Sequence, residues 1–321
     1  MIAPEVPLVV FGAGSIGERH ATLLRELGYL NVALYRQRQL PLRTLPADAV
    51  RTFTQLSEVE EFGPYAAIIS TPTAQHLEQT TWCVERGLHV LVEKPLSHTT
   101  QGIAELSQHA TEKNVLVQTA YMLRYHPLLQ RLKGWIDAEA FGPLLSFQST
   151  WAEYLPHWHP WEDYRTSYAA RRALGGGVAL TLSHDLDLAH WLVGTSASTW
   201  QRADNYRSSL EVDTEAGATF LLTYPHGVTG TVHLNYYQQV PQRRYEYTFE
   251  RALVVLDYYA STLTVQTPEG KEEYVAADFE RNDLFREQLL DFFRQTQLPH
   301  RAVLSQRYLR ESEVLITQCT Q

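Results

Sequence analysis

A glycine motif near the start of the chain constrains its fold more than any other feature. Residues 7–11 (PLVVF) form an apolar run typical of a buried strand, and residues 12–17 (GAGSIG) fit the pattern G-x-G-x-x-G. The next segment has apolar residues at helical spacing and stops at Gly28, a residue type common at helix ends. This order is typical of a dinucleotide-binding Rossmann unit, although a glycine trio alone also fits an ordinary turn. The motif predicts that a dinucleotide contacts Gly12, Gly14, Ser15, Ile16 and Gly17.

Short apolar runs alternate with amphipathic segments up to residue 120, which is typical of a parallel sheet covered by helices. Thr73 is a good N-cap for one of these helices. The expected strands are 31–35, 65–70, 88–92 and 115–120, and the expected helices are 73–86 and 99–112.

The pattern changes after about residue 121, where apolar residues alternate with a period of two. Such alternation predicts a mostly antiparallel sheet with one face packed on helices. We expect aromatic residues on its opposite face, suited to a subunit interface, and helices at 127–138, 183–193, 281–295 and 304–318. The fold class is therefore α/β, with a Rossmann domain over 1–121 and a second domain over 122–321, since single cores seldom exceed roughly 250–300 residues.

The charge and cysteine content narrow the partners. Lys and Arg total 27 against 36 for Asp and Glu, so the net charge is −9, which argues against nucleic acid and anionic membranes as partners. The cysteines are Cys83 and Cys319, without a CxxC pair, which fits a reducing compartment and excludes a thiolate zinc site. His157 and His159 lack a metal-binding helix motif, so we expect no metal. With no secretory signal or membrane-length apolar run, we expect a cytoplasmic protein.

The end of the second strand bears on the choice of dinucleotide. An NAD-binding protein usually has an acidic residue there for the ribose hydroxyls, but residues 34–38 read LYRQR. Arg36 and Arg38 suit the 2′-phosphate of NADP. The alternative is that both arginines are solvated in a surface loop, so NADP is the preferred cofactor and NAD remains open.

Glu93, Lys94 and Pro95 follow the expected strand 88–92, at the edge where parallel sheets bind ligands. A lysine there can stabilise an alkoxide or relay its proton. The proline suggests a fixed turn with a cis Lys94–Pro95 bond.

At this point the chain resembles the glucose–fructose oxidoreductase / inositol dehydrogenase (Gfo/Idh/MocA) family. Four pieces match in order along nearly the whole chain. They are the glycine motif, Ser70-Thr71-Pro72 with His76, the run 89–95 (HVLVEKP), and Gly175-Gly176-Gly177 followed by residues 184–187 (HDLD). Residues 124–127 (RYHP) also look like the family's entry into its second domain.

The resemblance implies a Rossmann domain, a second domain with a large open sheet used for dimer or tetramer assembly, and a nicotinamide in the cleft between them. It implies that Lys94 lies beside the nicotinamide and the substrate hydroxyl, and that His184 is the general acid/base. The alternative for His184 is a helix-start histidine satisfied by backbone groups. The further cofactor contacts implied are Ser70, Thr71, Pro72, His76 and Glu93.

One position departs from the family's pattern. Members that oxidise polyols often have an Asp four residues before this histidine, whereas this chain has Leu180 there and Thr181 as the nearest polar residue. This puts the usual Asp-and-His relay in doubt. Asp187, one helical turn after His184, is suited to orient the imidazole, but it could equally face solvent or cap a neighbour.

Residues 153–165 (EYLPHWHPWEDYR) mix aromatic and hydrogen-bonding side chains, a composition suited to a sugar ring and its hydroxyls. An aromatic loop that packs on its own domain is equally consistent. Arg165 or Arg124 suits a carboxylate or phosphate. The residues that we expect to bind substrate are Arg124, Tyr154, Trp161, Tyr164, Arg165 and Asp187.

These features predict an NADP-preferring oxidoreductase that moves a hydride to or from a hydroxyl-bearing carbon of a sugar, sugar acid or nucleotide sugar. A non-catalytic protein that binds dinucleotide and a sugar to regulate a partner is the alternative from another class. Reduction of a tetrapyrrole or a dihydrodiol is a third hypothesis, which Lys94 and His184 disfavour because they suit carbonyl–alcohol exchange. We expect a homodimer or homotetramer formed through the second sheet.

Overall fold

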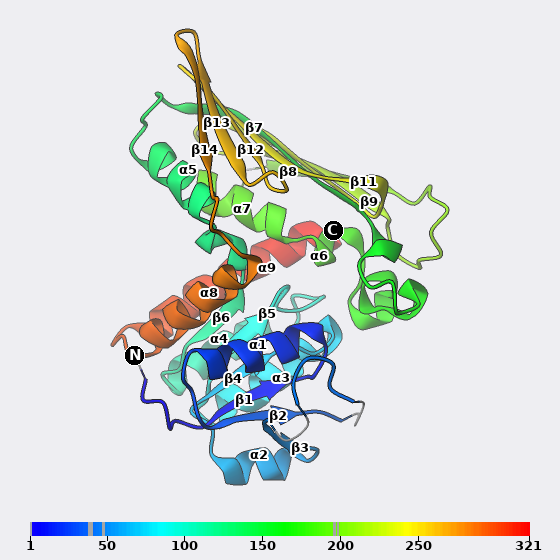
Figure 1. The fold of residues 1–321 in the computed structure, drawn as a ribbon, viewed down its shortest axis with the longest axis vertical. Helices are drawn as coiled ribbons and strands as arrows, with labels where there is room; N and C mark the ends of the chain where they lie inside the picture. The colour runs from blue at the N-terminus through cyan, green and yellow to red at the C-terminus, as the bar shows by residue number, and fades with distance from the viewer. Residues whose placement is uncertain (1, 38–40, 47–48, 195–196, 198) are drawn as a thin grey trace. The chain divides into compact units, whose positions relative to one another are not determined.

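The N-terminal part of the chain forms a six-stranded parallel sheet in the order β3-β2-β1-β4-β5-β6 (Figure 1). The central strands are apolar and buried, as expected for a parallel sheet with both faces covered. The strands are β1 (Leu8–Phe11), β2 (Val32–Tyr35), β3 (Arg51–Phe53), β4 (Ala66–Ile69), β5 (His89–Glu93) and β6 (Val117–Ala120). The helices are α1 (Ser15–Glu26), α2 (Leu56–Phe62), α3 (Thr73–Glu85) and α4 (Ile103–Glu112). The strand order reverses between β1 and β4, the kind of point where such sheets bind ligands.

Two elements of this part were not predicted, one helix begins later than expected, and the N-cap of another is not the residue expected. Strand β3 and helix α2 are too short and too polar to show a clear period. Helix α4 begins four residues later than expected because Gly102, just before it, has a φ of 87°. Thr73 is the first residue of α3, and Pro72 occupies the N-cap position instead.

The second half of the chain forms an eight-stranded sheet in the order β14-β13-β12-β11-β7-β10-β9-β8. Its neighbouring strands are antiparallel except for the parallel pair β7 and β10. The strands are β7 (Leu144–Tyr154), β8 (Thr199–Asn205), β9 (Gly217–Thr223), β10 (Thr229–Asn235), β11 (Tyr237–Phe249), β12 (Leu253–Asp257), β13 (Thr262–Thr267) and β14 (Gly270–Val275). Helices α5 (Pro127–Asp137) and α7 (His184–Val193) run along one face, and α6 (Val178–Thr181) precedes α7 (Figure 1). The predicted α/β class and mostly antiparallel second sheet are confirmed.

The buried aromatic residues of β7 and β11 lie on the helix-covered face of this sheet, not on the open face as we expected. Phe147 pairs with Tyr247 across β7 and β11, and both are buried. Ser149 shares their face and donates a hydrogen bond to Asp185 of α7 at 2.7 Å. The residues between them, such as Gln148, point to the open face and are exposed. The expectation was wrong because alternation shows that two faces differ, but not which face the helices cover.

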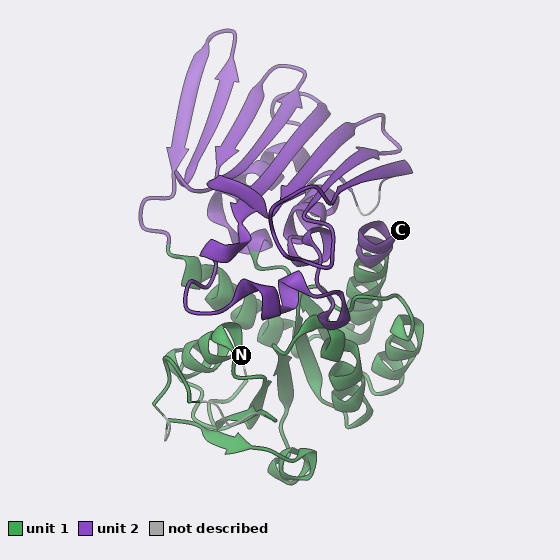
Figure 2. Ribbon diagram, turned by 90° about the vertical axis from the view of Figure 1, so that its right-hand side faces the viewer, with its two compact units in different colours: residues 1–122, 280–313 green, residues 123–279, 314–321 purple. Residues whose placement is uncertain are grey.

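The chain divides into two units that do not follow the sequence in single stretches (Figure 2). Unit 1 comprises residues 1–122 and 280–313, and unit 2 comprises residues 123–279 and 314–321. The structure is a computed structural model, and it describes residues 2–37, 41–46, 49–194, 197 and 199–321. The units differ from the expected division into 1–121 and 122–321 in that residues 280–313 group with the first unit.

Hydrogen bonds explain why those C-terminal residues group with unit 1. The region contains α8 (Arg281–Thr296) and most of α9 (Arg301–Thr320). The Ser305 hydroxyl on α9 donates to the carbonyl of Val115 at 2.8 Å and accepts from the N–H of Val117 at 2.9 Å. Helix α9 therefore completes the edge of the parallel sheet at β6. Among the helices that the structure describes, none has both the length and the apolar character that crossing a membrane requires.

Candidate active site

The three glycines of the N-terminal turn have three different surroundings. Gly12 has a φ of 93°, and a Cβ on it would lie 2.8 Å from the carbonyl oxygen of Ser70. A Cβ on Gly17 would lie 2.2 Å from the carbonyl oxygen of Gly12, so α1 packs directly against the turn. A Cβ on Gly14 would have no atom within 4 Å. This open approach to the start of α1, where backbone N–H groups point outward, fits the pyrophosphate of a dinucleotide.

The segment after β4 supports the same turn. The Ser70 hydroxyl donates to the carbonyl of Phe11 at 2.8 Å, and the Thr71 hydroxyl donates to the side chain of Gln79 at 2.7 Å. Ser70, Thr71 and Pro72 are all half-buried. The structure thus brings this predicted group beside the glycine turn, while their contact with a cofactor stays a prediction.

The end of β2 carries the residues expected to select the dinucleotide. Arg36 follows the last residue of β2, and its N–H donates to the carbonyl of Phe53 on β3. Its side chain is half-buried. Arg38 lies outside the described residues.

Glu18 of α1 fixes the loop that follows β2. Its carboxylate accepts hydrogen bonds from the N–H groups of Arg43, Thr44 and Leu45 and from the Thr44 hydroxyl, at 2.7 to 3.2 Å. Burial alone would raise the pKa of Glu18, but these hydrogen bonds hold the pKa below its usual value. The loop beside the expected adenosine end is therefore anchored to the helix that begins at the glycine turn.

Lys94 lies at the carboxyl end of β5, and its bond to Pro95 is cis. The preceding residue, Glu93, has its Oε1 atom 2.8 Å from Nε2 of His20 on α1. Burial alone would raise the pKa of Glu93, but the His20 hydrogen bond and the charges of His20 and Lys94 hold it below its usual value. Glu93 is therefore a carboxylate at neutral pH, next to the lysine.

His76, on α3, contacts the loop that follows β5 and contains Pro95. Its Nδ1 lies 2.8 Å from the carbonyl oxygen of Pro95, and its Nε2 lies 2.7 Å from that of Thr71. The ring is 2% exposed, and burial lowers its pKa. His76 thus joins the segments after β4 and β5. Its direct contact with a cofactor stays a prediction.

In unit 2, the triple glycine makes a turn that leads into α6 and then α7. Gly175 has a φ of 79°, and a Cβ on Gly176 would lie 2.3 Å from the carbonyl oxygen of Tyr168. Gly177 has a φ of 113°, and a Cβ on it would lie 2.7 Å from Oε1 of Glu215. Each glycine is therefore required by the backbone path or by a close neighbour.

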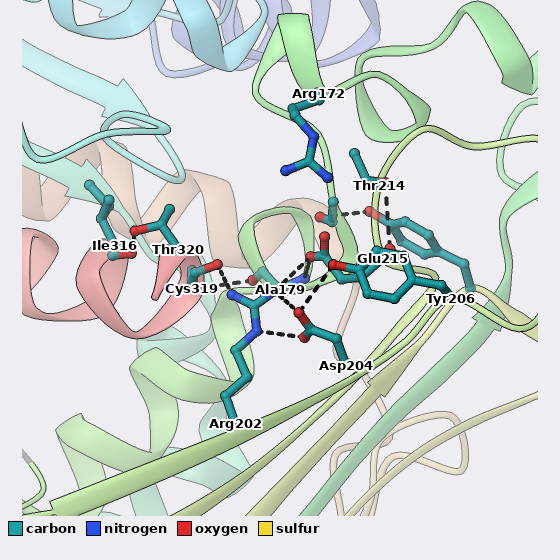
Figure 3. A network of polar contacts seen from close by, with 12 residues as sticks. Arg172, Ala179, Arg202, Asp204, Tyr206, Thr214, Glu215, Ile316, Cys319 and Thr320 are labelled. Atoms are coloured by element: carbon teal, nitrogen blue, oxygen red, sulfur yellow. Dashed lines mark hydrogen bonds and ion pairs between the residues drawn. The ribbon is translucent and has the colours of Figure 1, made fainter.

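A buried polar network holds this turn (Figure 3). Glu215 accepts from the N–H of Ala179 at 3.1 Å and lies 3.4 Å from the guanidinium of Arg202. Arg202 also binds Asp204 at 2.6 Å and donates to the carbonyl of Cys319 near the C-terminus. Burial raises the pKa of Glu215, and the Ala179 hydrogen bond and the charge of Arg202 oppose that rise. The network joins the glycine turn, the edge strand β8 and the end of α9.

His184 is the first residue of α7 and is 4% exposed. Its ring centroid is 6.1 Å from that of Trp151 on β7. The next residue, Asp185, points to the sheet and accepts from Arg243 at 3.0 Å, and Arg243 stacks on Trp151 with its Cζ atom 3.6 Å from the ring centroid. These buried contacts fix the start of α7 and with it His184.

Two residues expected to bind substrate are paired with each other. Arg124, in the 3₁₀ turn Met122–Tyr125, donates to both oxygens of Asp187 at 3.0 and 2.5 Å. Asp187 is 3% exposed, so it does not face solvent. Leu180 and Thr181 are both buried, and the Thr181 side chain is hydrogen-bonded with Tyr236.

The aromatic segment after β7 is tied to its own unit. Tyr154 packs edge-on against His157 with ring centroids 4.8 Å apart. The Tyr164 hydroxyl accepts from the N–H of Glu211, whose carboxylate also binds Arg165 at 3.1 Å. Trp161 is 64% exposed. Arg165 thus already has carboxylate partners, whereas Trp161 is largely exposed and packs edge-on against His159.

No group of three or more His, Cys, Asp and Glu side chains within the described part of the chain could hold a metal ion. Lys94 belongs to unit 1 and His184 to unit 2.

Family models match both parts of the chain. Residues 6–121 match the oxidoreductase family with an NAD-binding Rossmann fold, and residues 129–255 match the GFO/IDH/MocA C-terminal domain. The chain belongs to the Gfo/Idh/MocA oxidoreductase family. The resemblance inferred from the sequence is confirmed, and unit 1 contains an NAD-binding Rossmann fold.

Individual members of the Gfo/Idh/MocA family are similar at low identity. The rhizopine catabolism protein MocA of Rhizobium meliloti is 27% identical over 214 residues, which are 66% of this chain and 62% of that protein. Levoglucosan dehydrogenase of Pseudarthrobacter phenanthrenivorans is 30% identical over 140 residues, 41% of this chain and 35% of that enzyme. The matched region thus spans less than two thirds of either relative. The solved structure of a levoglucosan dehydrogenase with NADH and levoglucosan shares the fold, with a TM-score of 0.81, 17% identity, and 98% and 97% of the two chains covered.

Sequence reasoning missed the buried partners of the family's motifs. The sequence does indicate that His20 is buried, because it lies four residues after Ile16 and four before Leu24 on the apolar stripe of α1. Glu215 and Arg243 had no such indication, since their partners lie 36 and 58 residues away.

Proposed function

We propose that this protein is an NAD(P)-dependent oxidoreductase that transfers a hydride between nicotinamide and a hydroxyl or keto carbon of a sugar, sugar acid or nucleotide sugar. The observation that carries the proposal is Lys94 at the carboxyl end of β5, in the same sheet as a glycine turn open to a pyrophosphate. Similarity to the levoglucosan dehydrogenase of P. phenanthrenivorans supports the substrate class.

In the proposed reaction, the bound nicotinamide supplies or accepts the hydride. Lys94 donates a hydrogen bond to the substrate oxygen and, in reduction, gives it a proton. His184 is the second proton-transfer group, and Trp151 and the Asp185–Arg243 pair hold it in place. Leu180 is apolar and buried where many relatives have an Asp, so Lys94 and His184 carry the proton transfer without it.

The test is turnover of NADPH and NADH, followed by absorbance, with a panel of keto-sugars and nucleotide sugars. We expect Lys94→Ala to lower kcat about 10²–10⁴-fold, the usual contribution of a proton-transfer group. Lys113→Ala is the matched control. Lys113 directly follows the last residue of α4, is exposed, and has no role in the proposed reaction. Near-normal turnover of the Lys94→Ala variant would contradict the proposal. A wild-type protein that binds NADPH but turns over no substrate would favour the regulatory alternative.

NADP is the preferred cofactor in this proposal because Arg36 follows β2 and no acidic residue stands there. We expect Arg36→Gln to weaken NADP binding by about 10- to 150-fold, since a charge-assisted hydrogen bond contributes roughly 1.5–3 kcal/mol. NAD binding should change by less than about threefold, because NAD lacks the phosphate. Fluorescence titration measures both, and Arg51→Gln on β3 is the control. If Arg36→Gln loses affinity equally for NADP and NAD, Arg36 does not contribute to the preference for NADP.

We further propose that the protein is cytoplasmic and forms a homodimer or homotetramer through the open face of its second sheet. The low cysteine content and the absence of a paired-cysteine motif support the compartment. The face of the second sheet that α5 and α7 leave open supports the assembly.

A further inference from the structure

His20 joins the helix of the glycine turn to the loop that carries Lys94. It lies on α1, three residues after Gly17, and its side chain is fully buried. Its Nε2 atom is 2.8 Å from Oε1 of Glu93, the residue directly before Lys94. The two residues are 73 positions apart in the sequence, so only the packing of α1 on the parallel sheet brings them together.

The chemistry of this contact fixes which atom holds the proton. A carboxylate only accepts hydrogen bonds, so Nε2 of His20 must be the donor. The other ring nitrogen, Nδ1, is buried and has no hydrogen-bond partner among the residues that the structure describes. The ring packs edge-on against Phe285 of α8 at 5.5 Å. Glu93 is therefore the one polar group that this imidazole serves in the described structure.

The Lys94 backbone is held on both sides. On one side His20 binds the Glu93 side chain, and on the other His76 contacts the carbonyl of Pro95 at 2.8 Å. The charged groups that act on Glu93 are His20 and Arg19 from α1, His76 from α3, and Lys94 itself. The Glu93 side chain is 14% exposed, so part of it reaches the surface while Oε1 is bound.

We propose that His20 is a positioning residue for the reaction: by holding the Glu93 carboxylate, it sets the orientation and charge environment of the Lys94 ammonium. This inference rests on the proposed function only for its kinetic consequence. It predicts that kcat depends on a hydrogen-bond donor at the position of the His20 Nε2 atom, and not only on a side chain that fills the volume of the ring.

Three substitutions separate positioning from packing. The amide nitrogen of Gln reaches about as far as Nε2 of histidine, that of Asn reaches only as far as Nδ1, and Leu fills space without a donor. We expect kcat to fall least for His20→Gln, more for His20→Asn, and by about tenfold or more for His20→Leu, since misplacing a catalytic group costs up to about 10²-fold. Equal kcat for His20→Leu and wild type would overturn the inference.

A matched control removes the contribution of folding. His89 is also buried, begins the same strand β5 and accepts a hydrogen bond from the N–H of Leu116 at 2.9 Å, at the opposite end of the strand from Lys94. We expect His89→Gln to lower thermal stability while leaving kcat within about twofold of wild type, since it loses one hydrogen bond far from the chemistry. A loss of kcat in His89→Gln matching that in His20→Leu would show a folding effect and overturn the inference.

A double-mutant cycle tests whether His20 acts through Glu93. Residues that act as a unit give non-additive effects. We expect the His20→Leu/Glu93→Gln double variant to lose no more activity than about twofold beyond the worse single variant. Effects that multiply across the two sites would show independent roles and overturn the inference.

The same cycle is read without turnover by chemical labelling of Lys94. The acylation rate of its amine at pH 8, measured by mass spectrometry, is normalised to that of Lys271, which is exposed on β14. The nearby Glu93 carboxylate favours the unreactive ammonium, so we expect the Lys94 rate to rise about threefold or more in Glu93→Gln, which removes that charge. In His20→Leu the carboxylate loses the hydrogen bond that holds it beside the lysine. We therefore expect a rise of similar size in that variant and no further rise in the double variant. Unchanged labelling in His20→Leu would overturn the inference. If the variants show this labelling pattern but the wild-type protein turns over no substrate, the proposed function is refuted and the positioning role of His20 is not.

Discussion

Gly14 and Gly17 lie three residues apart in the same turn, yet they serve different ends. Gly17 has the carbonyl of Gly12 where a Cβ would be, so its constraint comes from the protein itself. Gly14 has a φ of −77° and open space around it, so the folded chain alone would accept a side chain there. A glycine at a position where the folded protein has space for a side chain indicates a ligand that approaches the backbone closely.

We therefore expect opposite effects from two alanine substitutions. Gly14→Ala should leave the unfolding free energy within about 0.5 kcal/mol of wild type. It should weaken NADPH binding about tenfold or more, because one lost charge-assisted hydrogen bond to the pyrophosphate already costs roughly 1.5–3 kcal/mol. Gly17→Ala should lower the unfolding free energy by about 1–3 kcal/mol through overpacking. Urea unfolding and fluorescence titration measure the two quantities, and unaltered NADPH binding by Gly14→Ala would argue against a dinucleotide at this turn.

At the scale of elements, side chains from one helix set the loops at the ends of neighbouring strands. Helix α1 holds the loop after β2 through Glu18 and the loop after β5 through His20. In unit 2, Glu215 from the segment before β9 holds the start of α6 through the N–H of Ala179, and Asp185 holds the start of α7 on the sheet through Ser149. The loops that carry the candidate site are therefore held by buried charges rather than by their own local structure.

The Glu18 anchor predicts a dependence of stability on pH. Its folded-state pKa is lowered, so the folded protein binds this proton more weakly than the unfolded chain, whose value is about 4.3. The contribution of Glu18 is fully present above that value and is lost as the pH falls through the lower folded-state pKa. We expect Glu18→Gln to be less stable than wild type at pH 7, with a difference that narrows progressively below about pH 4.3.

Urea unfolding at a series of pH values tests this, with Glu61→Gln as a control because Glu61 is exposed on α2. A difference between Glu18→Gln and wild type that stays constant from pH 7 to below pH 4 would mean that the carboxylate charge is not what anchors the loop.

At the scale of the whole molecule, the helices α5 and α7 cover one face of the eight-stranded sheet and leave its other face open (Figure 1). This face is mainly polar, with threonines on several strands, and its aromatic residues are turned to the helices. Leu221 on β9 is an exception, since it is 46% exposed there. Apolar residues on a flat polar face suit the centre of a subunit interface.

We expect the protein to sediment as a dimer or tetramer and Leu221→Glu to shift it toward the monomer, because a buried unpaired charge is costly at an interface. Analytical ultracentrifugation measures the shift. Val303→Glu is the control, since Val303 is also an exposed apolar residue, at 62%, but lies on α9 in unit 1. A monomeric wild type would rule out assembly through this face.

The sequence alone determined the features that local chemistry encodes. Residues 7–17 predicted a strand and a glycine turn because a buried strand and a tight turn each have a composition of their own. The run ending at Pro95 predicted a strand that delivers Lys94, and the structure has that strand with a cis Lys94–Pro95 bond. The period of two after residue 121 likewise predicted the second sheet.

Only the tertiary structure decided which distant groups meet. The contacts of His20 with Glu93, of Glu215 with Ala179 and of Arg124 with Asp187 join residues 36 to 73 positions apart. The face that buries Phe147 and Tyr247 was likewise set by the position of α7 on the sheet. A periodic pattern specifies which residues share a face of a helix or strand. Which element packs on that face depends on the arrangement of whole elements, and the residues adjacent in the sequence do not encode it.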